Sequence, residues 1–284
     1  MKTFRIIPRL DIKGPNLVKG IHFEGLRVLG SPQEFAKFYY EQGADELMYV
    51  DVVASLYNRN SLNDIISKTA KEISIPLLVG GGIRTIEDIR SVLRAGADRV
   101  SLNTAAITNP SIIGQAAKMF GSSTIVVTIE ASKQSNGQYL AFTDNGREHT
   151  GIEVLTWAKK VEELGAGEIV LSSIDREGTG LGFDLELIKL VSASVGIPVI
   201  AHGGCRNPDD VVLAIREGKA DGVSLASILH YKGIQSSTTA IAAGSEGNRT
   251  FMESGKTFSK ITPSTIQEIK KTLLKQNIAC RYEA

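Results

Sequence analysis

The chain has 284 residues, of which 42% are hydrophobic and 22% are charged, and its formal net charge is +1. This is an ordinary globular composition, and a nearly neutral chain gives no support for a nucleic-acid or acidic-membrane partner. No apolar run approaches the roughly 20 residues of a membrane-spanning helix, and the N-terminus leads straight into a predicted strand, so we expect a cytoplasmic protein. Two cysteines exclude a disulfide framework, and the four scattered histidines predict no metal site.

Apolar runs and amphipathic helix signals alternate along the chain. Unbroken apolar runs are typical of parallel strands that are covered on both faces. The helix signals between them include a predicted capping box at Ser31–Glu34 and similar starts at Thr85–Asp88 and Asn207-Pro208. This alternation predicts an α/β protein with a single (β/α)8 TIM barrel over residues 1–284. The eight predicted strands are 4–10, 46–51, 76–80, 98–103, 123–129, 168–173, 198–202 and 221–226.

One segment, at about 232–261, breaks the alternation. Its composition turns to Ser, Thr, Gly and Ala before Thr262-Pro263 begins a last predicted helix. By position it is an inserted loop after strand 8, at the end of the barrel where active sites lie. Two interpretations stay open, a surface loop without a function or a lid at the catalytic face.

An internal repeat divides the chain into two similar halves. The segment from Glu46 to Thr104 recurs 122 residues later, beginning at Glu168. Upstream of the two copies, the apolar runs that end at Asp11 and Glu130 lie 119 residues apart. The repeat predicts two duplicated half-barrels.

Glycines follow several predicted strands at the end of the barrel that holds active sites. Glycine lets backbone N–H groups approach a phosphate, and a following helix N-terminus adds a favourable dipole. Because the pattern occurs in both halves, we predict two phosphate cradles and an elongated substrate with a phosphate at each end. The first cradle is Gly80, Gly81 and Gly82 with Asn103 and Thr104; the second is Gly203 and Gly204 with Ala226 and Ser227; Ser172, Glu177 and Gly178 complete the candidate binding residues.

Two carboxylates end strands that lie opposite each other in an eight-stranded barrel. Asp11 closes strand 1 and Glu130 closes strand 5. Such a pair can divide the roles of general base and general acid if the environment separates their pKa values. A helix cap, or a salt bridge to a lysine such as Lys19, is the structural alternative for each; their symmetry favours catalysis.

Charged residues also begin several strands, at the opposite end of the barrel. Charge at these positions is unusual unless it is paired. A salt-bridged plug in the barrel floor is the structural interpretation, and Asp98 would then serve a partner protein docked beneath it. The four residues are Arg5, Glu46, Arg99 and Glu168.

Six motifs stand out together along the chain: Leu10–Lys13, Val18–Gly20, Asp51–Ser55, Val79–Ile83, Ser101–Ala106 and Ser173–Thr179. With them, residues 3–231, and less strongly the tail 262–284, resemble the cyclase subunits of imidazole glycerol phosphate synthase, which are duplicated (β/α)8 proteins of histidine biosynthesis. That resemblance implies a lyase that uses ammonia from a separate glutaminase, a class I glutamine amidotransferase docked on the N-terminal face. The substrate would be a bis-phosphorylated ribulosyl-formimino carboxamide ribonucleotide, and the products imidazole glycerol phosphate and aminoimidazole carboxamide ribotide.

The resemblance also implies roles for individual residues. Asp11 would be the general base, Lys19 would assist substrate binding, and Glu130 would occupy the general-acid position. The charged ring at the floor would be a gate for ammonia, and no cofactor or metal would be required.

Five features depart from the family pattern at the catalytic face. They suggest a second interpretation, a paralogue that supplies ammonia for amidino-sugar synthesis in surface polysaccharides, and a third, a non-catalytic ammonia conduit or scaffold. An Amadori-type isomerase is a more distant alternative. The departures are Glu130 and Glu177 in place of Asp, Arg9 and His202 in place of small residues, and the insertion at 232–261.

Overall fold

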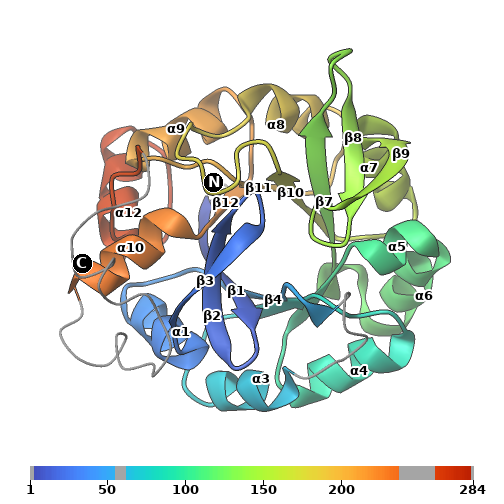
Figure 1. Ribbon diagram of the computed structural model, residues 1–284, viewed down its shortest axis with the longest axis horizontal. Helices are drawn as coiled ribbons and strands as arrows, with labels where there is room; N and C mark the ends of the chain where they lie inside the picture. Colours follow the sequence, from blue (N-terminus) through green and yellow to red (C-terminus); the bar gives the residue numbers. More distant parts are fainter. Residues whose placement is uncertain (1–2, 55–61, 237–259, 283–284) are drawn as a thin grey trace.

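The computed structural model describes residues 3–54, 62–236 and 260–282, in which eight parallel strands close into a barrel surrounded by helices (Figure 1). The strand order is β1-β4-β5-β6-β7-β10-β11-β12, and pairing of β12 with β1 closes the ring. Each predicted apolar run overlaps one of these strands, which confirms the predicted fold. Their bounds are β1 Arg5–Lys13, β4 Leu47–Asp51, β5 Leu77–Gly80, β6 Arg99–Leu102, β7 Ile125–Lys133, β10 Glu168–Ser173, β11 Val199–His202 and β12 Gly222–Leu225.

Side chains along each strand point alternately into the barrel interior and toward the helices outside it. In β1, Ile6 and Leu10 pack in the main core between barrel and helices, whereas Ile7 belongs to a second, separate cluster. The second cluster has one apolar residue from each of six strands, as expected for a filled barrel interior. Its members are Ile7, Met48, Leu78, Val126, Val170 and Ile200.

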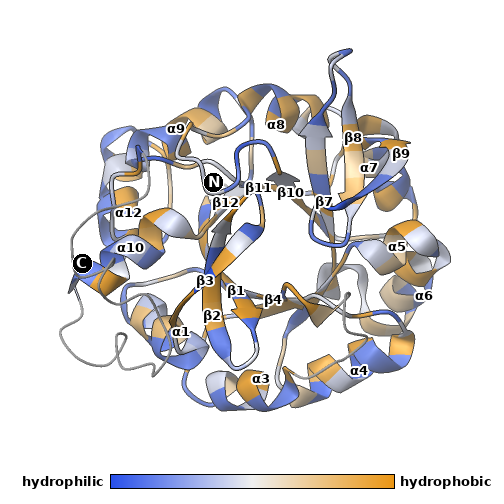
Figure 2. Cartoon of the chain, viewed as in Figure 1, coloured by the Kyte–Doolittle hydropathy of each residue, from blue (hydrophilic) through white to orange (hydrophobic). Residues whose placement is uncertain are grey.

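The surrounding helices turn their apolar residues toward the barrel (Figure 2). Thr85 forms the predicted capping box at the start of its helix, and Asn207 caps another. The capping box predicted at Ser31 is wrong, because the Ser31 hydroxyl bonds to the Gln33 side chain at 2.9 Å rather than to the backbone. The helices are α1 Pro32–Glu41, α3 Asn63–Ala70, α4 Ile86–Ala95, α5 Thr104–Thr108, α6 Ser111–Phe120, α7 Val154–Glu163, α8 Leu185–Ser192, α9 Pro208–Arg216, α10 Ser227–Ser236 and α12 Ile266–Lys275, with a 3-10 turn at Ser122–Thr124.

Two antiparallel extensions rise from the barrel where the sequence shows long connections after strands 1 and 5. The first consists of β2 (Asn16–Ile21) and β3 (Glu24–Gly30), and the second of β8 (Tyr139–Thr143) and β9 (Glu148–Glu153). The turns at Asn136-Gly137 and Asn145-Gly146 join β7 to β8 and β8 to β9, with positive φ at Gly137, Asn145 and Gly146. These four strands themselves were not predicted.

The region after β12 contains helix α10, which includes residues 232–236 at the start of the predicted inserted loop. Residues 237–259 of that loop lie outside the described residues. In the part of the chain that the structure describes, no helix has both the length and the apolar character needed to cross a membrane.

Candidate active site

Asp11 and Glu130 occupy corresponding positions on opposite walls of the barrel. Asp11 lies in β1 and Glu130 in β7, and three strands separate β1 from β7 on either side of the ring. Both side chains are buried, with 3% and 6% of their surfaces exposed. The structure therefore places the two carboxylates as the repeat predicts.

The Asp11 carboxylate pairs with Arg9. The Nε atom of Arg9 donates to Oδ1 of Asp11 at 2.7 Å, and the Arg9 side chain is 1% exposed. Burial alone would raise the pKa of Asp11, but the Arg9 guanidinium and the Lys19 ammonium outweigh it and hold that pKa below its usual range. Asp11 is therefore ionised at neutral pH, as a general base must be.

Glu130 lies in the opposite electrostatic environment. Burial raises its pKa to about 7, although Arg9 and the backbone N–H of Gly146, which donates to Oε2 at 2.8 Å, both act to lower it. A substantial fraction of Glu130 is therefore protonated near pH 7 and can donate a proton. The environment separates the two pKa values as a base and acid pair requires.

Lys19 does not pair with Asp11. Its ammonium group forms an ion pair with Glu177 and donates to the carbonyl of Gly20 at 2.6 Å. Glu177 also accepts from the backbone N–H of Phe23 at 3.0 Å. These buried contacts fasten the β2–β3 hairpin to the segment that follows β10. The predicted role of Lys19 in substrate binding stays a prediction.

The first predicted cradle lines a cavity of about 360 Å³. Gly81 and Gly82 precede α4, and Asn103 and Thr104 lie at the start of α5. Arg9 and Glu130 also line this cavity, so the cradle and the candidate acid share one space. The Thr104 hydroxyl accepts from the backbone N–H of Asp144 at 3.2 Å, which ties the cradle to the β8–β9 turn.

The second cradle lines a separate cavity of only about 20 Å³. Of the predicted residues, Ser172 is not among its lining residues and instead lies 3.4 Å from Nη1 of Arg9. His202, which we noted only as a departure from the family pattern, does line it. The predicted residues that meet there are Glu177, Gly178, Gly203, Gly204, Ala226 and Ser227.

The repeat extends to the backbone geometry of the two cradles. Gly81 has φ +90° and Gly203 has φ +100°, values that side-chain-bearing residues rarely adopt. A Cβ atom on Gly81 would lie 2.2 Å from the carbonyl oxygen of Asp51, and one on Gly203 would lie 2.7 Å from that of Ser173. Asp51 and Ser173 are 122 residues apart, as are the two glycines, so both halves require glycine for the same steric reason.

Sequence reasoning missed Arg9 as a partner of Asp11. The signal was available, because side chains two residues apart on a strand point to the same face. Arg9 and Asp11 therefore both point into the barrel from β1, where a cation and an anion this close would be expected to pair.

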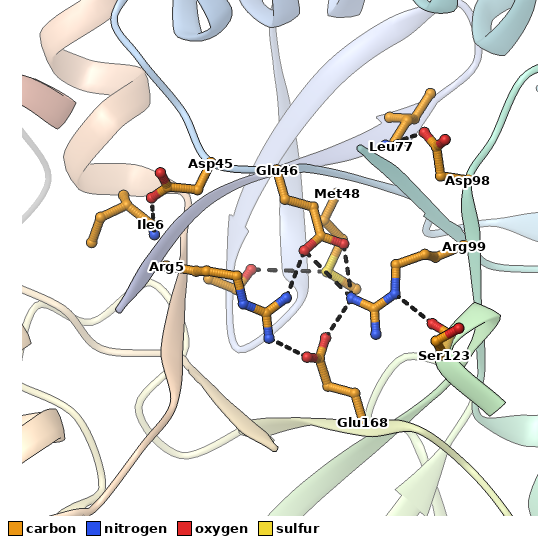
Figure 3. A network of polar contacts seen from close by, with 11 residues as sticks. Arg5, Ile6, Asp45, Glu46, Met48, Leu77, Asp98, Arg99, Ser123 and Glu168 are labelled. Atoms are coloured by element: carbon orange, nitrogen blue, oxygen red, sulfur yellow. Dashed lines mark hydrogen bonds and ion pairs between the residues drawn. The ribbon is translucent and has the colours of Figure 1, made fainter. Parts of the chain in front are cut away.

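The four charged residues predicted at the floor form one network (Figure 3). Arg99 Nη1 donates to Glu46 Oε1 at 3.0 Å and to Glu168 Oε1 at 2.7 Å. Arg5 donates to Glu46 Oε2 at 2.9 Å and also pairs with Glu168. The network lies at the amino ends of the strands. Asp11 and Glu130 lie toward the opposite, carboxyl ends, which form the mouth of the barrel.

Replacing Glu168 by Gln should destabilise the fold by about 2–3 kcal/mol, because the substitution leaves two arginines with one carboxylate in a largely buried ring. The partial exposure of Arg5, whose side chain is 29% exposed, keeps the effect below that of a fully buried pair. Urea unfolding measures it. The exposed Glu186, which pairs with Lys133, is the matched control, and Glu186→Gln should change the unfolding free energy by less than about 0.5 kcal/mol. Equal losses for both variants would contradict a structural role for the ring.

Asp98, the residue predicted to face a partner protein, has a structural contact. Its Oδ2 accepts from the backbone N–H of Leu77 at 2.9 Å. Its repeat counterpart Asp221 accepts from Val199 at 2.8 Å in the same way. Both aspartates therefore fasten the start of a neighbouring strand, and the partner role of Asp98 stays a prediction.

Comparisons with known proteins show the family to which the chain belongs. The model of the histidine biosynthesis protein family matches residues 5–235. A Legionella pneumophila protein named imidazole glycerol phosphate synthase subunit HisF is 58% identical over 204 residues, which cover 72% of this chain and 96% of that protein. Proteins of the same name from Lactococcus lactis and Methanocaldococcus jannaschii are 49% and 47% identical, and the matches cover 81% and 82% of this chain and 90% and 92% of those proteins. The chain belongs to the histidine biosynthesis protein family.

Proposed function

We propose that this chain is the cyclase subunit of an imidazole glycerol phosphate synthase. It uses ammonia to convert the bis-phosphorylated ribulosyl-formimino carboxamide ribonucleotide into imidazole glycerol phosphate and aminoimidazole carboxamide ribotide. The observation that carries the proposal is the arrangement of the mouth, where an ionised Asp11 and a Glu130 with a raised pKa lie between two repeat-related cradles. The names of the three relatives support it, and none of them is named for surface-sugar synthesis.

The two carboxyl groups divide the proton transfers. Attack of ammonia on a carbonyl carbon leaves a proton on nitrogen, and Asp11 accepts it. Loss of the carbonyl oxygen as water needs a proton donor, and Glu130 supplies it. Arg9 stabilises the ionised form of Asp11 before the substrate binds.

The two cradles bind the two phosphates of the substrate. Gly81, Gly82, Asn103 and Thr104 hold one phosphate, and the second cradle holds the other. The two glycine turns provide backbone N–H groups at repeat-related positions. One elongated substrate then lies across the mouth with its reacting carbon atoms between Asp11 and Glu130.

Ammonia comes from a separate glutaminase, a class I glutamine amidotransferase that docks at the amino ends of the barrel strands. The ring of Arg5, Glu46, Arg99 and Glu168 lies at this face and controls the entry of ammonia into the barrel. Above it lies the apolar interior cluster that contains Ile7 and Met48. This role in the complex needs neither a cofactor nor a metal.

The proposal is tested with the purified chain, the bis-phosphorylated substrate and excess ammonium at pH 8, without a glutaminase. We expect loss of the substrate's absorbance and formation of both products in equal amounts, identified by mass spectrometry. With 15N-labelled ammonium, the label should enter only the imidazole product. Substrate binding without either product would refute the cyclase function.

A further inference from the structure

His202 is a buried histidine with one unused nitrogen. It closes β11, and its side chain is 4% exposed. Its Nδ1 lies 2.9 Å from the carbonyl oxygen of Ser224, and because a carbonyl only accepts, Nδ1 must carry the proton. The lone pair is therefore on Nε2, which has no hydrogen-bond partner among the described residues.

The ring is neutral. Burial and the nearby Arg9 guanidinium lower the pKa of His202 to about 3. A neutral imidazole with its proton on Nδ1 offers only an acceptor at Nε2, so it repels a phosphate oxygen and attracts an O–H or N–H donor. A phosphate dianion is the wrong partner for this atom.

The position of His202 connects the second cradle with the catalytic carboxylate. The residue lines the same small cavity as Gly203, Gly204 and Ser227. Ile200, two residues earlier on β11, belongs to the apolar cluster inside the barrel, and because alternate side chains on a strand share a face, the His202 ring also points into the barrel. A ligand phosphate in the cradle would bring the adjoining carbon atoms to His202.

We propose that His202 determines specificity at the second cradle by accepting a hydrogen bond, at Nε2, from a substrate hydroxyl near the phosphate. The inference rests on the proposed function for the identity of the substrate. A buried acceptor without a partner is costly, so a ligand that brings a hydroxyl group is favoured over one that lacks it. Together with the backbone of Gly203 and Gly204, His202 therefore selects a phosphate ester of a polyol over a bare oxyanion.

The binding role is tested first by 15N NMR of the histidine rings in the wild-type chain, with sn-glycerol 3-phosphate and sulfate as probes at pH 8. Glycerol phosphate brings hydroxyl donors, whereas sulfate has none. We expect saturating glycerol phosphate to move the Nε2 resonance of His202 in the direction of hydrogen-bond acceptance, and sulfate to leave it in place. An unmoved His202 with saturating glycerol phosphate, or protonation of the ring by either probe, would overturn the proposal.

His230 is the internal control for this spectrum. It is also buried, its pKa is likewise lowered by burial to about 3, and its Nδ1 lies 2.6 Å from the hydroxyl of Tyr39. It packs against Phe35 and does not line either cradle. Its resonances should stay unchanged with both probes, and an equal shift at His230 would assign the change to the fold as a whole and overturn the proposal.

The second test is kinetic. His202→Leu removes the acceptor and should raise KM for the bis-phosphorylated substrate about tenfold with a smaller change in kcat, whereas His202→Gln, which keeps an acceptor, should stay within about threefold of wild type. Thermal unfolding confirms that both variants are folded. An unchanged KM in His202→Leu, or a loss confined to kcat, would overturn the binding role. If the wild type itself shows no turnover, the proposed function fails, and the NMR experiment still decides the role of His202.

Discussion

Replacing Asp11 by Asn is expected to lower kcat with ammonium by about 10³-fold. A positioned general base contributes about 10²–10⁴ in rate, and the amide cannot accept the proton. The substitution is close to isosteric, so substrate binding should change much less than kcat. Steady-state rates at saturating substrate and ammonium measure the loss.

Asp209→Asn is the control for this experiment. Asp209 is exposed in the first turn of α9, on the outer ring of helices. Its replacement should leave kcat within about twofold of wild type, because it contacts neither cradle nor carboxylate. A chain in which Asp11→Asn retains full ammonium-dependent turnover would rule out Asp11 as the base.

Replacing Glu130 by Gln should have the second-largest effect, about 10²-fold on kcat, because the amide cannot donate an acidic proton.

The same substitution should stabilise the fold at alkaline pH. The pKa of Glu130 in the folded chain is about 7 and its ordinary value is 4.5, so the fold favours the neutral form. As the pH rises through about 7, the wild type loses stability because the buried carboxyl group must ionise. The difference of roughly 2.5 pKa units corresponds to about 3 kcal/mol.

Urea unfolding at pH 4.5 and pH 9 measures the difference in unfolding free energy between the Glu130→Gln variant and the wild type. We expect Glu130→Gln to be more stable than wild type at pH 9 and nearly equal to it at pH 4.5, where Glu130 is protonated in the fold. Glu148→Gln, at an exposed position of β9, should show the same small difference at both pH values. If the Glu130→Gln variant is less stable than wild type at pH 9, the raised pKa of Glu130 is wrong.

Much of the fold could be predicted because the repeat and the alternation of elements are local signals. Apolar runs mark the barrel strands, and the copies 122 residues apart predict that the two halves fold alike. The strands β2, β3, β8 and β9 could not be predicted in the same way. They extend beyond the barrel and are not continuous apolar runs. β2 pairs with β1 and β8 with β7, and β3 and β9 pair with β2 and β8 in turn, contacts that no local pattern indicates.

The site was predicted less completely than the fold, for a physical reason. Asp11 and Glu130 could be predicted to lie at the same end of the barrel because each follows an apolar run. Side chains alternate along a strand and the barrel is closed, so both carboxylates point into one space. The ion pair between Lys19 and Glu177 joins residues 158 positions apart, and no local pattern indicates it. The second cavity is lined in part by Ile261, which packs against Gly180, 81 positions earlier in the chain, a contact that only the assembled structure shows.

In the proposed complex, one substrate spans both cradles with Asp11 and Glu130 between its ends. This arrangement is tested by 31P NMR of the bis-phosphorylated substrate titrated, without ammonium, with the Asp11→Asn chain, which should bind the substrate without converting it. We expect both phosphorus resonances to shift with a single dissociation constant and to reach saturation at one substrate per chain. A shift of only one resonance would show that only one cradle binds phosphate, and a substrate that spans both cradles would be ruled out.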